Sequence, residues 1–453
     1  MHAATLAAHR FGFSEPSLQA LGNDPRGWVL AQLHQPAPLD GTGLMSGPAA
    51  WLMTRQYLDG VLGAPAAGSA APAASAMAPP AAAVPGADAL RQQVRRASGL
   101  ALQRRWQHLA ATPTPVYERW VGFWANHFSV AATKGTMLGL VWPYEREAIR
   151  PHATGRFGDM LRATTVHPAM LLYLDNAQSI GPNSRAGQRR SRGLNENLAR
   201  ELLELHTVGV QGGYTQADVT ALAALLTGWS LDRESGASRF NPQLHEPGPK
   251  QVLGRRYPEG PQALDLLLAD LAHHPATARF VSGKLACHFV TDDPPAALVD
   301  ALVQRFQATD GDLLALADAL FSHDLTWQAQ APPKFKRPEE LVLSAHRVLQ
   351  LPVVQTERLA TVLAQMGQPP GRAPSPQGWP DRTEDWLAPD ALWKRTEWAA
   401  DFGRQHARAD ARQLAARSFG PDLGTETRQQ IDRADSGAQA LALWLASPEF
   451  QRR

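Results

Sequence analysis

The sequence contains a single cysteine, Cys287, among its 453 residues. One thiol cannot form an intramolecular disulfide, and it cannot supply the several thiolates of a zinc-cysteine site. Cys287 lies in the apolar helical stretch SGKLACHFV, where a buried structural thiol is expected. Disulfide-stabilised folds and thiolate metal clusters are therefore excluded.

A large net charge is also absent, because 44 Lys and Arg residues nearly balance 42 Asp and Glu residues to leave +2. No overall field recruits nucleic acid or an anionic membrane. The most basic run, around 185–192, lacks interleaved aromatic residues and is interpreted as a solvated loop. No apolar run is long enough to cross a bilayer, and the N-terminal residues lack the pattern of a secretory signal. We therefore expect no nucleic-acid partner, no membrane insertion and a cytoplasmic protein.

Two common enzyme signatures are missing as well. No G-x-S-x-G elbow follows a strand pattern, which disfavours a serine hydrolase of the α/β type. No glycine fingerprint for phosphate or dinucleotide binding occurs. Nucleotide-dependent chemistry is disfavoured for the same reason.

Helical periodicity dominates what is present. Apolar residues recur every three or four positions along most of the chain, and 44% of all residues are hydrophobic, which supports a substantial core. We predict an all-α protein with one main core, with at most a short hairpin between Trp229 and Val252. Loops at 178–194, 231–250 and 366–390 are long enough to contain functional residues.

The domain organisation follows from one change in composition. An Ala/Pro-rich segment cannot build a core and should form a flexible insertion. We divide the chain into an N-terminal helical part of the core at 1–62, this insertion at 63–92, and a main helical domain at 93–453.

The segment from Asn195 to Leu231 combines polar and apolar faces. Glu201 and Glu204 fall on one stripe of a helix, beside a stripe of leucines. Buried carboxylates cost several kcal/mol unless they are paired, protonated or metal-bound. Thr215, with Asp218 three residues on, predicts a capping box at the start of the next helix. The order is helix, glycine turn, helix.

This segment and several others resemble the bacterial domain-of-unknown-function family numbered 1800. The resemblance covers nearly the whole chain outside 60–92. It implies no settled activity, although members of that family often occur beside an uncharacterised family, numbered 1501, that looks like an alkaline phosphatase or sulfatase. The matching segments are WVGFWANHFSV (120–130), IRPHATGRFGDML (149–161), HPAMLLYLDN (167–176), NENLARELLELHTVGV with GGYTQADVTALAALLTGW (195–229), HEPGPKQVLG (245–254), HFVTDDPPAALV (288–299), KFKRPEELVLSAHRVL (334–349) and GWPDRTEDWL (378–387).

Histidines in these segments, together with the helical carboxylates, suggest a metal. Neutral imidazoles with carboxylates suit a divalent transition metal such as zinc, iron, manganese or copper. We predict His127, Glu201, Glu204 and His206 as its ligands. The rival interpretations are a hydrogen-bonded core histidine at His127 and a buried ionic network in which Arg200 or another arginine pairs with the glutamates.

Three further residues are predicted to act catalytically. His152 and His245 are candidates for proton transfer, and Lys250 in the Gly/Pro-rich HEPGPK loop is a candidate for an oxyanion contact. The GWPDRTEDW segment is expected to pack on the surface or cover a cleft.

Two functional classes fit these residues. The first is a metal-dependent enzyme, hydrolytic or oxidative, acting on an unknown substrate through a His/Glu site. The second is a non-catalytic helical scaffold or partner protein with a buried ionic network. For the second, the family resemblance implies a phosphatase- or sulfatase-like partner, and co-export with such a partner would place the protein in the periplasm.

Overall fold

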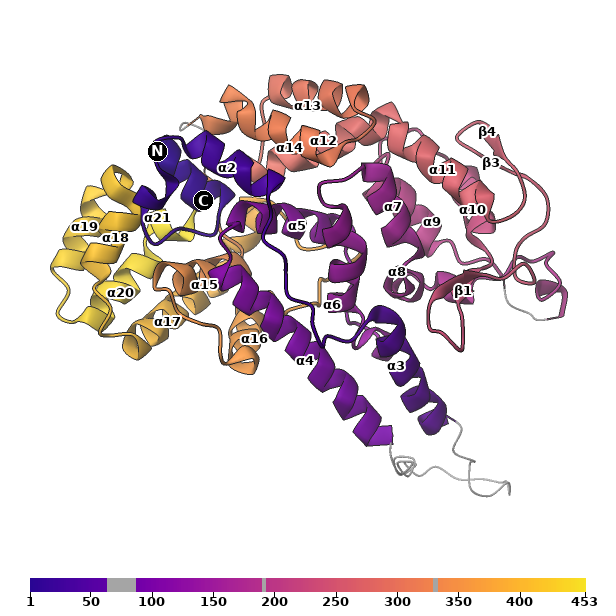
Figure 1. Ribbon diagram of the computed structural model, residues 1–453, viewed down its shortest axis with the longest axis horizontal. Coiled ribbons are helices and arrows are strands. Elements are labelled where there is room, and N and C mark those ends of the chain that lie inside the picture. The colour runs from indigo at the N-terminus through magenta and orange to yellow at the C-terminus, as the bar shows by residue number, and fades with distance from the viewer. Residues whose placement is uncertain (63–86, 190–192, 329–332) are drawn as a thin grey trace.

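The computed structural model describes residues 1–62, 87–189, 193–328 and 333–453. They form a predominantly helical protein, as predicted, with two small antiparallel hairpins. Helices α3 and α4 pair and project from the body, while the two chain ends lie close together (Figure 1). The N-terminal residues contact the C-terminal part of the chain, where the backbone N–H of His2 and the hydroxyl of Thr5 donate to Asp422.

The elements have the following bounds. The α-helices are α1 (Ala3–Thr5), α2 (Pro25–His34), α3 (Gly47–Leu62), α4 (Ala87–Ala111), α5 (Pro115–His127), α6 (Val141–Tyr144), α7 (Phe157–Val166), α8 (Pro168–Tyr173), α9 (Asn197–Glu201), α10 (Gln216–Leu226), α11 (Gln262–His273), α12 (Pro275–Phe289), α13 (Ala296–Ala308), α14 (Leu313–Ser322), α15 (Pro338–Val348), α16 (Thr356–Gln365), α17 (Pro389–Gln405), α18 (Ala411–Phe419), α19 (Thr425–Asp432), α20 (Gly437–Ala446) and α21 (Pro448–Gln451). Short 3-10 or π-helical turns are η1 (Leu6–Phe11), η2 (Leu18–Leu21), η3 (Gly135–Met137), η4 (Glu145–Ile149), η5 (Arg150–His152), η6 (Asn176–Gln178), η7 (Gly187–Arg189), η8 (Leu202–His206), η9 (Asp324–Trp327), η10 (Thr383–Trp386) and η11 (Gly420–Asp422). The strands are β1 (Trp229–Leu231), β2 (Ser238–Phe240), β3 (Lys250–Val252) and β4 (Arg255–Tyr257).

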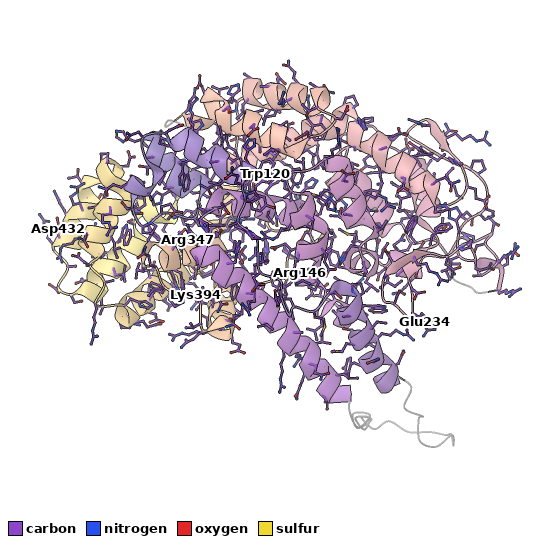
Figure 2. All side chains as sticks on the ribbon, in the orientation of Figure 1. Trp120, Arg146, Glu234, Arg347, Lys394 and Asp432 are labelled. Atoms are coloured by element: carbon purple, nitrogen blue, oxygen red, sulfur yellow. The ribbon has the colours of Figure 1, made fainter. Side chains whose placement is uncertain are left out.

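Buried apolar side chains form two clusters, so the expectation of one main core is wrong. The larger cluster surrounds α5 and includes Trp120, which lies in the middle of the molecule (Figure 2). The smaller cluster lies among α15 to α20 and includes Trp444. Helix α4 extends from the paired arm into the body, where its Trp106 belongs to the smaller cluster.

Local sequence signals explain several element boundaries. Thr215 and Asp218 form the predicted capping box at the start of α10. Helices α11 and α12 are separate because Pro275 begins a new helix and His274 caps it by accepting from the N–H of Ala276. A sequence period alone cannot show such a break, since the apolar spacing continues across it.

One predicted boundary needs correction. Helix α4 begins at Ala87, so residues 87–92 belong to a helix and not to the insertion. The other predicted insertion residues, 63–86, lie outside the described part of the chain. The expected hairpin is present as β1 paired with β2, and a second hairpin, β3 with β4, which was not predicted, follows from Lys250.

In the described ranges, no helix has the length and apolar content needed to cross a bilayer.

Candidate functional site

The structure brings two of the predicted metal ligands together. His127 at the end of α5 and His206 at the end of η8 are both about 1% exposed, and their ring centroids are 6.4 Å apart. The Nε2 atom of His127 is 3.1 Å from the backbone carbonyl of His206. Burial and the charge of Lys284 lower the pKa of His206 to about 3, and burial lowers the pKa of His127 well below its usual value. Both imidazoles are therefore neutral near pH 7.

The two predicted glutamate ligands interact with each other's charge and with Arg200. Glu201 and Glu204 are half-buried, and Arg200 lies 3.6 Å from Glu204 in an ion pair. Burial and then the charge of Glu204 raise the pKa of Glu201. Neither glutamate is among the groups that shift the pKa of His127 or His206. Arg200 thus pairs with Glu204, but the two side chains are 39% and 25% exposed, so this pair is not the buried ionic network of the alternative interpretation.

The predicted catalytic residues lie on other elements. His245 and Lys250 are buried together, with Lys250 Nζ 3.3 Å from His245 Nε2. Lys250 also donates to the carbonyl oxygens of Glu246 and Gly248, and His245 Nδ1 donates to that of Thr227 at 2.8 Å. These hydrogen bonds hold the loop closed and occupy polar atoms of both side chains that a ligand would otherwise contact. His152 lies half-buried on η5.

Metal binding needs a convergent set of donors. Among the residues that the structure describes, no group of three or more His, Cys, Asp or Glu side chains is placed to hold a metal ion. The two imidazoles alone do not make a complete ligand set of the ordinary kind.

A different polar cluster lies where the two hydrophobic clusters meet. Glu340 on α15 is about 4% exposed, and its carboxylate is 3.0 Å from Arg119, 3.2 Å from Arg337 and 3.2 Å from Arg453. Although burial disfavours its charge, these three guanidinium groups hold the pKa of Glu340 well below its usual range. The carboxylate is therefore ionised.

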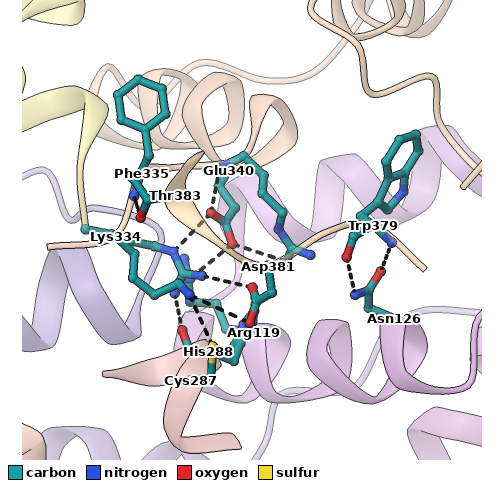
Figure 3. A network of polar contacts seen from close by, with 12 residues as sticks. Arg119, Asn126, Cys287, His288, Lys334, Phe335, Glu340, Trp379, Asp381 and Thr383 are labelled. Carbon is teal, nitrogen blue, oxygen red and sulfur yellow. Dashed lines mark hydrogen bonds and ion pairs between the residues drawn. The ribbon is translucent and has the colours of Figure 1, made fainter. Parts of the chain in front are cut away.

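Asp381 provides the second carboxylate of this cluster (Figure 3). Its Oδ1 atom is 2.9 Å from Nδ1 of His288, and Lys334 and Arg453 each lie 3.9 Å from the carboxylate. Despite burial, His288 and Lys334 hold the pKa of Asp381 below its usual range. An ionised carboxylate can only accept, so Nδ1 of His288 must bear the proton and donate it to this hydrogen bond.

Positive charge exceeds negative charge in this cluster. Burial and the nearby Arg453 lower the pKa of Arg119 to about 9, and burial with Arg119 lowers that of Lys336 well below its usual value. Burial also lowers the pKa of Arg395 to about 10. A buried cation whose pKa falls in this way would be stabilised by a further anion.

A cleft of about 110 Å³ opens beside these groups. Its lining includes His288, Arg119 and Arg337 from the cluster, together with Asn126 of α5 and Trp379 of the 366–390 loop. Asn126 fixes that loop with two bonds, because its Nδ2 donates to the carbonyl of Trp379 at 2.9 Å and its Oδ1 accepts from the Trp379 N–H at 2.7 Å. Both bonds are visible in Figure 3.

A chain of ion pairs also lines the cleft. Arg105 of α4 lies 2.8 Å from both Glu145 and Glu339, and Arg150 binds Glu118 with both guanidinium nitrogens, at 2.7 and 2.8 Å. Glu118, Glu145 and Glu339 all line the cleft. Each of these carboxylates already has a cationic partner.

Sequence reasoning missed this cluster. It followed the histidines and the glutamates at 201 and 204, and it expected the GWPDRTEDW segment only to pack on the surface or to cover a cleft. The structure places Asp381 of that segment against buried His288. A usable signal was present, since four of the segments that carry the family resemblance meet here: 120–130, 288–299, 334–349 and 378–387.

The fold and the cleft define a helical protein with a buried ionic site between two apolar clusters. The sequence profile of the family described as "Protein of unknown function (DUF1800)" matches residues 6–452. The chain belongs to this family. No curated protein and no solved structure matches it.

Proposed function

We propose that the protein is an enzyme that binds a small anionic substrate in this cleft and moves a proton with His288. The observation that supports the proposal is the hydrogen bond between His288 and Asp381, beside two arginines that line the same cleft. An imidazole oriented by a carboxylate is a recurrent general base, and paired guanidinium groups are preferred partners of carboxylates and phosphates.

The proton chemistry of His288 follows from its neighbours. Because Nδ1 donates to Asp381, Nε2 is the nitrogen that can accept a proton. Burial lowers the pKa of His288 to about 3, and Arg453 and Arg337 contribute to that lowering. An anion bound beside these arginines offsets their charge and raises the pKa of the imidazole. Substrate binding would thus make His288 a stronger base, which links binding to proton uptake.

The size of the cleft limits the substrate. A volume of about 110 Å³ is several times the roughly 10–15 Å³ that one water needs by the same measure. It suits a small carboxylate or a phosphate- or sulfate-bearing molecule, and it does not suit a polymer.

Binding and proton uptake can be tested on the whole protein. Inorganic phosphate, sulfate and acetate would be titrated in a calorimeter at pH 7 in two buffers of different ionisation enthalpy. We expect at least one anion to bind with a heat that depends on the buffer, which reports proton uptake. His288→Gln should abolish that buffer dependence. His346→Gln, which removes an imidazole bonded to the Val342 carbonyl outside this cleft, should leave it unchanged.

The outcomes separate the two parts of the proposal. If no anion binds, the cleft does not recognise an anionic substrate. If an anion binds but the buffer dependence persists in His288→Gln, another group takes up the proton. Turnover of a compound from the binding class, lost in His288→Gln while binding is retained, is the expected sign of catalysis.

A metal-dependent enzyme is the second candidate, and one observation favours it. His127 Nδ1 and His206 Nε2 are buried without a hydrogen-bond partner in the described residues, which leaves two nitrogen lone pairs or N–H groups unsatisfied. A divalent transition metal there would also need Glu201, Glu204 or other donors. Elemental analysis should find near one equivalent of metal in the native protein and a clear loss in His206→Ala. Substoichiometric metal before and after reconstitution would reject this candidate.

A further inference from the structure

A second cavity, of about 930 Å³, lies between α16 and α17, and α15 contributes Val342 and His346 to its lining. Helix α16 packs against α4 and α17 packs against α20, so each has its main partner on another side (Figure 1). The volume falls in the range of roughly 300–1,000 Å³ that is typical of small-molecule sites. Among the described residues, this cavity shares no lining residue with the cleft beside His288.

The inner surface of this cavity is apolar and aromatic. Leu359 and Met366 of α16 are buried in its lining. On α17, Trp398, Phe402 and His406 follow one another every four residues, with successive ring centres 5.2 and 4.5 Å apart. Side chains at this spacing share one face of a helix. The three rings therefore form a continuous row along which an extended apolar chain can pack.

The charged residues of the lining leave one cation uncompensated. Lys394 forms an ion pair with Glu397 at 2.8 Å, and Arg404 forms one with Asp401. The fifth charged residue is Arg358, which lies exposed in the first turn of α16. Its guanidinium group has no ion pair and no hydrogen bond with any residue in the described part of the chain. The lining thus has an excess positive charge at its rim.

The N-terminal end of α16 adds to this positive charge. The lining follows α16 from its N-cap residue, Gln355, to Met366. The side chain of Gln355 makes no capping hydrogen bond, so the first N–H groups of the helix and its dipole favour an anion at this end. Burial lowers the pKa of His346 and of His406, so both imidazoles are neutral near pH 7. The positive groups therefore gather at one end of an otherwise apolar cavity.

We propose that this cavity binds a single-chain amphiphilic carboxylate of the fatty-acid class. The carboxylate lies at the rim, beside Arg358 and the first turn of α16, where water still reaches it. The alkyl chain lies along the aromatic row of α17, where it is removed from water. Burial of the chain supplies most of the affinity, and the positive end selects an anion over a cation. This proposal does not depend on the function proposed for the cleft beside His288.

Calorimetry with matched amphiphiles tests the proposal on the full-length protein. Dodecanoate, octanoate and dodecyltrimethylammonium would be titrated below the concentrations at which they form micelles. We expect dodecanoate to bind with a negative change in heat capacity, which reports burial of the chain. It should bind more tightly than octanoate, and at least about tenfold more tightly than the cation with the same chain. Hydrogen exchange should slow in 351–366 and 394–406 when dodecanoate is bound.

Two substitutions separate the roles of charge and chain. Arg358→Glu should weaken dodecanoate binding at least about tenfold and strengthen binding of the cation. The matched control, Arg428→Glu, changes an exposed arginine of α19 outside the lining and should alter neither affinity. Val362→Trp fills part of the cavity from the half-buried lining of α16 and should weaken both ligands at an unchanged melting temperature. If this variant does not fold, the exposed position of Arg358 still gives a decisive result.

Four results would overturn the inference. They are the absence of dodecanoate binding, equally tight binding of the cation, slowed exchange only around the cleft beside His288, and equal affinities for dodecanoate in Arg358→Glu and Arg428→Glu.

Discussion

Replacing Glu340 by Gln is the most direct test of the buried ionic cluster. The carboxylate of Glu340 has three guanidinium partners at 3.0 to 3.2 Å, and it also accepts the backbone N–H of Arg337 at 2.9 Å. Gln has nearly the same shape but no charge. The substitution therefore changes the electrostatics of the cluster while it conserves the packing.

The expected loss of stability is large. Removing one partner of a buried ion pair leaves an uncompensated charge and costs about 3–5 kcal/mol. Glu340 is about 4% exposed, so water cannot replace the lost carboxylate. We expect Glu340→Gln to lower the free energy of unfolding by about 4 kcal/mol. The control is Asp300→Asn, which breaks a 2.8 Å ion pair with Arg279 between side chains that are 52% and 62% exposed. That change should cost less than about 1 kcal/mol.

Urea unfolding, followed by both circular dichroism and tryptophan fluorescence, would measure the difference. The two signals must coincide for a single free energy to apply, because the protein has two hydrophobic clusters. A loss below about 1 kcal/mol in Glu340→Gln would refute the claim that this carboxylate is ionised and compensates buried cations.

The pH dependence gives a second check with a definite sign. The pKa of Glu340 is depressed in the folded protein, so its contribution is fully present above its unfolded pKa of about 4.3. The contribution is lost as the pH falls through the lower folded pKa. The stability difference between wild type and Glu340→Gln should therefore be constant from pH 7 to about pH 5 and should shrink below about pH 4.

Three further predictions concern single local features. Asn126→Ala removes both bonds to Trp379 and should cost about 1–3 kcal/mol, with faster hydrogen exchange in the 366–390 loop as the specific readout. Gly378→Ala should destabilise the protein by at least about 1 kcal/mol in urea unfolding, because Gly378 has φ +86° and an added Cβ would lie 2.5 Å from the Asn126 carbonyl oxygen; an unchanged midpoint would contradict this backbone geometry. Thr215→Ala removes the cap of α10 and should cost about 1 kcal/mol, whereas Thr215→Ser should restore most of it.

The sequence predicted those parts of the fold that local interactions determine. The helical class, the capping box at Thr215 and the hairpin that begins at Trp229 depend on residues within a few positions of one another. Breaks such as the one at His274 and Pro275 were missed because the apolar period of α11 continues into α12. The division into two hydrophobic clusters depends on how helices pack, and no local pattern records it.

The candidate site was harder to predict for the same reason. Arg119, His288, Glu340 and Asp381 are far apart in the sequence, and only the tertiary fold brings them together. The helical pattern of the sequence does not distinguish the buried arginine and glutamate side chains of α5 and α15 from those on a solvent-exposed, charged helix face. The sequence analysis favoured histidines because they commonly bind metals, and the structure does place His127 beside His206. In the described residues, however, Glu201 and Glu204 do not join these histidines in a metal-binding group.

Because the cleft lies between the two hydrophobic clusters, ligand binding in the cleft is coupled to the packing of one cluster against the other. Arg119 and His288 lie on helices of the larger cluster, whereas Arg337 and Glu340 belong to the segment that begins the smaller one. A ligand that contacts both sides must stabilise their association by the same free energy with which that association strengthens its binding. Substitutions remote from the cleft that loosen the contact between the clusters should therefore weaken ligand affinity, even though they touch no ligand atom.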